Sequence, residues 1–360
     1  MAPLRLRDRD AIISKEGLIF RVFGYSHPSN ACICDVEYAP EAIFKSNSPK
    51  AYRNRGDHVF YKFYEDEGWK FVNKAFPQYM VFHEMLDKMV VGVNHSSIAE
   101  VRRPKEKLEN LNGAKSKDEL HGALQDLLKI VSRYSDLSTK DFGVFGSLLH
   151  GFYHPKFSDM DLVVYGVRNA TRLSETLQEL YANDSSPLKN EFETDILTRG
   201  KPWLFENYSA KEFVWHQQRK LIYALFRDEK SGRIIKTEFE PVKEWKEIVN
   251  EYDSRMKIVQ RGWVRLFAHI EEDDEASFIP SIYDIEPLKV LGGTKEAVEV
   301  RRIISYMEEF RLQAQKDEVV YVEGNLEEVM TPEGNFHQIA LTYCPRYYEQ
   351  VLKVASLNSR

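Results

Sequence analysis

The stretch from Val144 to Val164 constrains the fold of this chain more than any other. It reads as the end of a β-strand, a Gly146-Ser147 turn, the start of a helix, and then Asp159-Met160-Asp161 at the start of a second strand. Because side chains alternate between the two faces of a strand, we expect Asp159 and Asp161 on one face, a few ångströms apart. Two such carboxylates repel each other unless a cation lies between them, and paired hard oxygen ligands suit Mg²⁺.

The Gly-Ser turn supplies the complementary half of this predicted site. Gly146 allows a close approach of the backbone, while Ser147 and the free amides at the start of a helix can hold phosphate oxygens. A phosphate-binding turn that faces a pair of metal-binding carboxylates is the arrangement needed for in-line transfer to or from the phosphorus atom of a nucleotide.

This stretch resembles the signature of the nucleotidyltransferase superfamily, which includes DNA polymerase beta, CCA-adding enzymes and the minimal nucleotidyltransferases. The matching residues are Phe145-Gly146-Ser147 and, after a gap of eleven residues, Asp159-Met160-Asp161-Leu162-Val163. The resemblance covers roughly residues 115–250 and implies transfer of a nucleoside monophosphate from an NTP with two Mg²⁺ ions. Asp159 and Asp161 would bind metal, and Gly146 and Ser147 would hold the triphosphate. The whole chain, including Arg9-Asp10 and Lys15-Glu16-Gly17, also resembles a group of predicted archaeal nucleotidyltransferases.

Members of the superfamily usually have a third carboxylate on a neighbouring strand. Glu238 and Glu240 share one face of the predicted strand 234–240 and are our candidates for this catalytic position, with Glu238 as the third metal ligand. Aspartate is the usual residue, and Asp195 is a competing candidate. If both glutamates are merely solvated, the domain would bind nucleotide and metal yet catalyse poorly.

Basic residues nearby provide candidates for phosphate contacts. The segment 199–236 carries nine Lys or Arg against four acids, a net charge of +5, interleaved with tryptophan and tyrosine. Such a strip could hold a triphosphate or follow an RNA backbone, with rings stacking on bases, or it could be a solvated face with its aromatic rings in the core. In this strip we select Arg219 and Lys220 as nucleotide-binding candidates, and we add Lys156, which lies in the gap between Ser147 and the carboxylates. His150 and His154 suggest zinc as a less favoured alternative to Mg²⁺.

The order of expected elements divides the chain into three segments: a β-rich domain 1–112, a nucleotidyltransferase domain 113–252 and a β-rich domain 253–360 with one helix. We expect helices at 75–86, 119–131, 170–181, 211–218 and 295–313 from apolar residues at helical spacing. A similar strand pattern begins at Gly17 and again at Gly262. This similarity is either a coincidence or the trace of a duplicated β-module.

Composition limits the remaining possibilities. With 43% hydrophobic and 29% charged residues the chain is a globular protein, and a net charge of −6 argues against a protein that coats nucleic acid throughout. No apolar run is long enough to span a membrane, the charged start is unlike a signal peptide, and three cysteines make a disulfide framework unexpected. We therefore predict a soluble cytoplasmic protein of undetermined oligomeric state.

The sequence thus predicts an α+β protein in which a mixed sheet with helices is flanked by two β-rich domains. The predicted activity is Mg²⁺-dependent transfer of a nucleoside monophosphate from an NTP to a hydroxyl, with a tRNA-like RNA as the favoured acceptor. Two alternatives keep the fold. One is a nucleotide- or RNA-binding protein that has lost catalysis, and the other is an enzyme that nucleotidylates a protein side chain.

Overall fold

The computed structural model describes residues 4–64, 66–193, 205–207, 209–343 and 346–355. Its contacts group the chain into two compact units. The first contains residues 1–83, 88–189 and 224–252, and the second contains residues 84–87, 190–223 and 253–360. The N-terminal sheet and most of the central segment, which we predicted as separate domains, therefore lie in one unit. The predicted boundaries between three domains stay a prediction.

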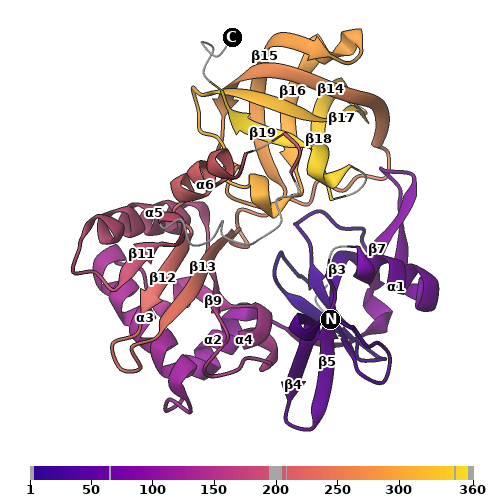
Figure 1. The fold of residues 1–360 in the computed structure, drawn as a ribbon. Helices are drawn as coiled ribbons and strands as arrows, with labels where there is room; N and C mark the ends of the chain where they lie inside the picture. The colour runs from indigo at the N-terminus through magenta and orange to yellow at the C-terminus, as the bar shows by residue number, and fades with distance from the viewer. Residues whose placement is uncertain (1–3, 65, 194–204, 208, 344–345, 356–360) are drawn as a thin grey trace. The chain divides into compact units, whose positions relative to one another are not determined.

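The first unit begins with an eight-stranded sheet of mainly antiparallel pairs (Figure 1). Its core contains Leu18, Phe20, Val36 and Val93, which are almost fully buried. The sheet runs in the order β4-β5-β3-β2-β1-β8, and β7 joins β3 to β6. The strands are β1 (Ala11–Ser14), β2 (Ile19–Val22), β3 (Ala31–Pro40), β4 (Tyr52–Arg55), β5 (His58–Lys62), β6 (Met80–His83), β7 (Lys88–Asn94) and β8 (Ile98–Arg102).

The helix expected at 75–86 is wrong. Helix α1 (Glu67–Ala75) ends where that helix was expected to begin, and Pro77 starts a single 3-10 turn. Residues 80–83 then form β6, which pairs with β7 in an antiparallel hairpin. Proline cannot continue a helix from the preceding turn, and a short apolar run fits a strand as well as a helix. The pairing of residues 80–83 with β7 therefore decides that this run forms a strand.

The central segment forms a five-stranded sheet in the order β11-β12-β13-β10-β9. The helices expected at 119–131 and 170–181 are confirmed as α3 (Glu119–Ser135) and α5 (Val167–Ala182), each burying a leucine stripe. The N-cap of α3 is Asp118, whose side chain accepts from the His121 N–H. The other elements are α2 (Pro104–Asn112), α4 (Gly146–His150), β9 (Phe142–Val144), β10 (Met160–Tyr165), β11 (Leu188–Asn190), β12 (Tyr223–Arg227) and β13 (Ile234–Val242).

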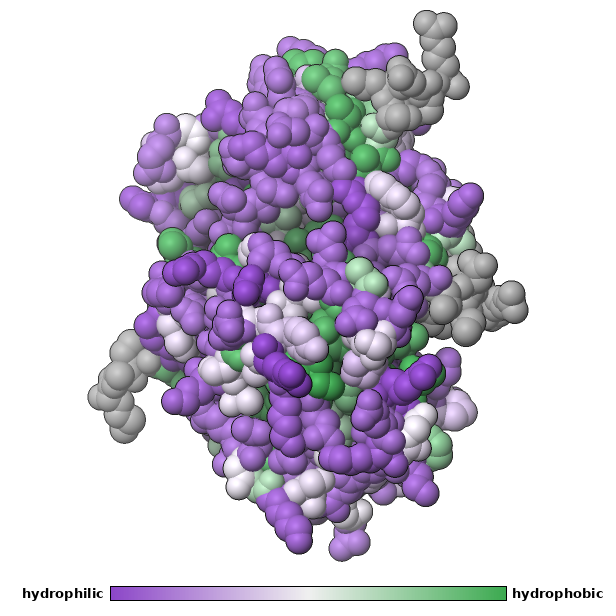
Figure 2. Space-filling view, turned by 90° about the vertical axis from the view of Figure 1, so that its left-hand side faces the viewer, coloured by the Kyte–Doolittle hydropathy of each residue, from purple (hydrophilic) through white to green (hydrophobic). Residues whose placement is uncertain are grey.

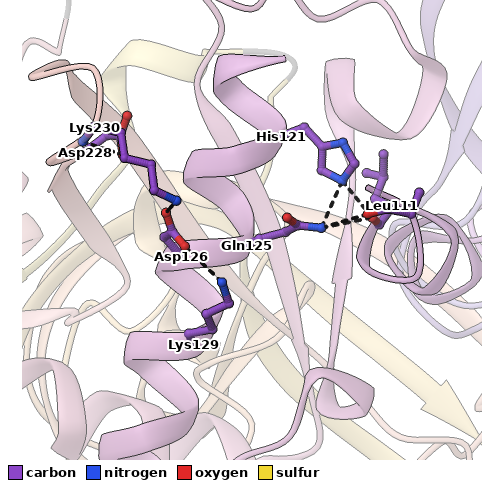
Figure 3. A network of polar contacts seen from close by, with 8 residues as sticks. Leu111, His121, Gln125, Asp126, Lys129, Asp228 and Lys230 are labelled. Carbon is purple, nitrogen blue, oxygen red and sulfur yellow. Dashed lines mark hydrogen bonds and ion pairs between the residues drawn. The ribbon is translucent and has the colours of Figure 1, made fainter. Parts of the chain in front are cut away.

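Helix α3 is attached on two sides by polar contacts (Figure 3). The Nε2 of His121 lies 2.6 Å from the Leu111 carbonyl at the end of α2, and Gln125 also donates to that oxygen. Because the Lys117 N–H donates to Nδ1 of His121, Nε2 carries the proton. Farther along the helix, Asp126 pairs with Lys230 in the β12–β13 turn. These contacts link α3 to the end of α2 and to the β12–β13 turn.

The second unit contains helix α6 (Ala210–Arg219), which confirms the helix expected at 211–218, and a six-stranded sheet. The sheet runs in the order β14-β15-β16-β18-β17-β19 and also pairs β14 with β17, so it closes on itself. Its strands are β14 (Lys257–Glu272), β15 (Ser281–Gly292), β16 (Val300–Ser305), β17 (Val319–Thr331), β18 (Gly334–Leu341) and β19 (Val351–Val354).

The helix expected at 295–313 is wrong. Residues 295–299 form a 3-10 turn, residues 300–305 form β16, and residues 308–310 form a second 3-10 turn. The apolar side chains of Val300, Ile303, Met307 and Phe310 have helical spacing, but all four enter the core of the closed sheet. Pairing of β16 with β15 and with β18 satisfies the backbone, and this long-range pairing overrides the local pattern.

The similar patterns at Gly17 and Gly262 both lie in antiparallel strand pairs, β2 with β3 and β14 with β15. The two sheets differ in strand order, and duplication stays a prediction. Hydrophilic side chains prevail on the face seen in Figure 2, with scattered hydrophobic patches. Among the described helices, none is both long enough and apolar enough to cross a membrane.

Candidate active site

The Gly146-Ser147 pair begins α4 directly after β9 and lies against β10. Gly146 has φ of +57°, a left-handed conformation that suits glycine. A Cβ atom on residue 146 would lie 2.5 Å from the Asp161 Oδ2, and the Phe145 N–H donates to the Asp161 carbonyl at 3.0 Å. The absence of a side chain at residue 146 therefore makes room for the Asp161 carboxylate beside the turn.

The two aspartates differ in environment. Asp161 lies in β10 and is half-buried, whereas Asp159 precedes the strand and is exposed. Burial, together with the nearby charges of Asp159 and Glu240, raises the pKa of Asp161 to about 7. Although Asp159 as a residue is exposed, partial desolvation of its carboxyl group raises its pKa, against the opposing effect of the cations Lys236 and Arg233. The site concentrates negative charge in a partly desolvated place, which favours a bound cation.

The predicted neighbouring strand is present. β13 lies parallel to β10, with Glu238 in register with Asp161 and Glu240 in register with Val163. Residues in register on parallel strands share a face, so Glu238 lies beside Asp161 and is half-buried. Glu240 lies two residues farther along β13 and is 2% exposed. Asp195, the competing candidate, lies outside the described residues.

An arginine from the N-terminal region occupies the place beside Glu240. Arg9 and Glu240 form an ion pair in which both side chains are almost completely buried. The Arg9 guanidinium lies 5.2 Å from the centre of the Phe145 ring, directly before the Gly-Ser turn. The pair makes Glu240 a structural anchor for the N-terminal segment and leaves Glu238 the better placed candidate for a third carboxylate.

Two lysines complete the electrostatic environment of Asp161. Lys62 at the end of β5 and Lys236 on β13 both oppose the rise in its pKa, and both are half-buried. Sequence reasoning missed Arg9 and Lys62 as site residues, since each comes from a strand-rich region far from the motif. Arg9 was part of the similarity to archaeal proteins, which was the only available signal.

The loop before Asp159 is held from the β12–β13 turn. Arg233 donates from Nη1 to the Pro155 carbonyl at 3.0 Å and from Nη2 to the Ser158 carbonyl at 2.5 Å. Lys156 is exposed at the tip of this loop, and its N–H donates to the His154 Nδ1. A contact between Lys156 and a phosphate stays a prediction.

The two histidines of the zinc alternative lie in different surroundings. His150 is 1% exposed, packs against Tyr38 and Phe152, and has its Nδ1 3.1 Å from Arg102. His154 is exposed and stacks on Phe157. Among the described residues, no group of three or more His, Cys, Asp or Glu side chains is placed to hold a metal ion. The packing of His150 makes it a core residue.

Arg219 and Lys220 are engaged inside the second unit. Arg219 pairs with Glu318 at 2.5 Å and lies over the Trp215 ring, and Lys220 is 2% exposed and donates to the Glu309 carbonyl at 2.5 Å. These contacts attach α6 to the C-terminal sheet. Nucleotide binding by the two residues stays a prediction, as does binding of RNA by the 199–236 strip.

Comparison with known proteins agrees with this geometry. Residues 124–249 match the nucleotidyltransferase domain, and this match supports nucleotidyl transfer in general. An uncharacterized protein of the archaeon Methanocaldococcus jannaschii is 26% identical over 359 residues, which cover 98% of this chain and 99% of that protein. No solved structure matches the chain.

The matched segment contains the Gly-Ser turn, both aspartates and β13. The chain is thus an α+β protein in which the segment 124–249, similar to the nucleotidyltransferase domain family, lies between β-rich regions.

Proposed function

We propose that the protein transfers a nucleoside monophosphate from an NTP to a hydroxyl group, with RNA as the acceptor. The observation that carries this proposal is the placement of Asp161, which lies against the Gly146 turn on one side and beside Glu238 on the other. A phosphate grip and a carboxylate cluster thereby share one end of a sheet, as in-line transfer requires.

The donor set fits Mg²⁺. Asp159, Asp161 and Glu238 offer hard oxygen atoms, and desolvation raises the pKa of both aspartates, so a bound cation would stabilise their charged forms. Mg²⁺ is usually bound by one or two carboxylates together with substrate phosphates and water. When bound, two such ions would activate the attacking hydroxyl and neutralise the leaving pyrophosphate.

The residues of the chain would share the remaining tasks. The amides of the Gly146-Ser147 turn would orient the triphosphate, and Asp159 and Asp161 would hold the metal ions, with Glu238 as the third ligand. Lys62 and Lys236 are close enough to Asp161 to affect its pKa, so each could also neutralise a phosphate oxygen. Glu240 would act by positioning, through its pair with Arg9.

The acceptor and the compartment are inferred from residue types along the chain. RNA is favoured because the 199–236 strip is basic and aromatic, and in it Trp215 exposes 46% of its surface. We place the reaction in the cytoplasm, since Cys32 and Cys34 are free thiols. The proposed domains of the chain are those predicted from the sequence, residues 1–112, 113–252 and 253–360.

The test is a scan of the four labelled NTPs with Mg²⁺ against total RNA and protein extract. We expect label in RNA, and its loss in the variant Asp159→Asn with Asp161→Asn. The matched control is Asp136→Asn with Asp184→Asn, whose carboxylates are exposed and should not matter. Incorporation that survives the first variant would contradict the mechanism. Label in protein would favour nucleotidylation of side chains, and nucleotide binding without incorporation would favour loss of catalysis.

A further inference from the structure

A second basic site lies in the first unit, outside the predicted motif. Arginines alternate at positions 5, 7 and 9, and Arg9 reaches Glu240 as described above. The other two line a pocket of about 660 Å³ together with residues from the start of α2 and from the chain after β13. Its lining includes four basic side chains and one large aromatic ring, those of Arg5, Arg7, Arg103, Lys105 and Trp245.

The pocket has more cations than its own carboxylates compensate. It contains four basic side chains and two acidic ones, Glu106 and Glu109. Arg103 pairs with Glu106 at 3.3 Å. Within the described part of the chain, Arg5, Arg7 and Lys105 have no ion pair with a carboxylate. Arg5 and Arg7 instead lie over the Trp245 ring, at 5.1 and 4.6 Å from its centre.

Arg7 is the most informative of these cations. Its side chain is buried, with 6% exposure, and its Nη1 donates to the Lys243 carbonyl at 3.0 Å. Its guanidinium also lies 3.8 Å from the centre of the Tyr165 ring. The buried Nε atom has no hydrogen-bond partner among the described residues. An arginine stays charged at every physiological pH. The charge of Arg7 lowers the pKa of the nearby Asp10, but burial raises that pKa to about 7, so this carboxyl group offsets the buried charge of Arg7 only in part. The arrangement therefore has room for an external anion.

The pocket is distinct from the candidate active site. Tyr165, which Arg7 covers, is four residues beyond Asp161 on β10, so the two places are separated by about 13 Å along the strand. The charges are also opposite, because carboxylates dominate at Asp161 and cations dominate in the pocket. A ligand of the pocket therefore need not be the substrate of the proposed transfer.

We propose that this pocket binds a small ligand through two or more phosphate groups. Several guanidinium and ammonium groups that converge on one volume match the charge and the donor geometry of a polyphosphate. The volume lies in the range of small-molecule sites, and the cluster is compact rather than drawn out into the long stripe that follows a nucleic-acid backbone. The proposal does not depend on the proposed catalytic activity.

The test is calorimetric titration of the full chain with inorganic tripolyphosphate in EDTA, which removes metal ions from the candidate active site. We expect saturable binding that weakens about tenfold in Arg5→Ala and in Lys105→Ala, since each removes a charge-assisted contact. Both side chains reach the surface, and removing a cation from the first turn of α2 does not harm the helix, so the variants should fold. Melting temperatures check this point.

Two control variants make the result specific. Lys129→Gln removes an exposed cation elsewhere on the first unit, and Asp161→Asn changes the candidate active site; neither should alter the affinity. A parallel titration with ATP separates the sources of phosphate. An affinity for ATP equal to that for tripolyphosphate would mean that the pocket recognises phosphates alone. Tighter binding of ATP, with the same sensitivity to Arg5→Ala, would mean that the ligand is a nucleotide. No saturable binding, an equal loss in Lys129→Gln, or a loss only in Asp161→Asn would overturn the proposal. Binding of RNA but not of tripolyphosphate would overturn it too.

Discussion

A single missing methyl group determines how the Gly-Ser turn meets Asp161. We expect Gly146→Ala to lower the rate of nucleotidyl transfer at least a hundredfold, because the new Cβ would displace the Asp161 carboxylate. The matched control is Gly232→Ala, which also has positive φ, +72°, but has open space around its Cβ position. Each variant should lose about 1–2 kcal/mol of stability from the left-handed conformation. Urea unfolding and turnover measure the two effects, and equal activity in both variants would contradict this account of Gly146.

The buried pair of Arg9 and Glu240 provides a second prediction at this scale. Removing one partner of a buried ion pair leaves an uncompensated charge, so Arg9→Ala should cost about 3–5 kcal/mol of unfolding free energy. Adding Glu240→Gln should recover part of that loss, because it removes the stranded charge. Lys45→Ala, which breaks an exposed pair with Glu41, should cost under about 1 kcal/mol. If Arg9→Ala and Lys45→Ala were equally mild, Arg9 would not anchor the N-terminal segment.

Asp10 predicts how stability depends on pH. It is 1% exposed and accepts from the Arg7 N–H at 3.1 Å, and burial raises its pKa from 3.8 to about 7. Between pH 4 and 7 the folded state therefore binds more protons at Asp10 than the unfolded state does. The contribution of Asp10 to the unfolding free energy thus falls as pH rises, by up to about 1.4 kcal/mol per pH unit.

Urea unfolding at pH 5 and at pH 8 measures this contribution. Asp10→Asn keeps an oxygen acceptor but does not titrate, so it should lose less stability over the interval than the natural chain does. The control Asp136→Asn changes an exposed carboxylate and should leave the pH dependence unaltered. A variant Asp10→Asn that loses as much stability as the natural chain would show that Asp10 is not the group responsible.

Local chemistry explains which site residues could be predicted from the sequence. Gly146, Asp159 and Asp161 lie close together along the chain, and the spacing of turn and strand alone places them. Arg9 and Lys62 reach the same site from β-rich segments about a hundred or more residues away. Their position depends on how the N-terminal sheet packs, which no local pattern encodes.

At the scale of elements, the turn between β12 and β13 holds the loop that precedes Asp159. We expect Arg233→Ala to speed hydrogen exchange in residues 154–159, because it removes two hydrogen bonds to loop carbonyls. The same variant should weaken metal binding at Asp159, whose position depends on that loop. Arg227→Ala on the same hairpin is the control, since Arg227 is exposed. Unchanged exchange in the loop would show that it is held by other contacts.

The elements also show where periodicity succeeds and where it fails. α3 and α5 are long, and each presents one leucine stripe, so helical packing agrees with the local pattern. At 295–313 the same spacing belongs to a strand between two 3-10 turns, because β16 finds partners on both sides. Long-range pairing of this kind is decided by the whole sheet and cannot be inferred from one segment.

At the scale of the molecule, the N-terminal sheet and the central segment share one interior. Ile19, Tyr38 and Phe152 form a common apolar cluster, and the Lys243 N–H donates to the Tyr25 hydroxyl. Asn250 exchanges two hydrogen bonds with the main chain of His27. The segment that we predicted to be the nucleotidyltransferase domain therefore shares its interior with the N-terminal sheet.

This shared interior predicts that the two regions unfold together. In native-state hydrogen exchange of the full chain, the most protected amides of β2 and β3 should report the same opening free energy as those of β10 and β13. Arg9→Ala should lower all four values by the same amount, because its ion pair joins both regions. Lys140→Ala, an exposed change, should lower none of them. If the amides of β10 and β13 instead stayed protected while those of β2 and β3 exchanged, the central segment would be an independent folding unit. The contacts through Arg9 and Tyr38 would then only dock the N-terminal sheet onto it.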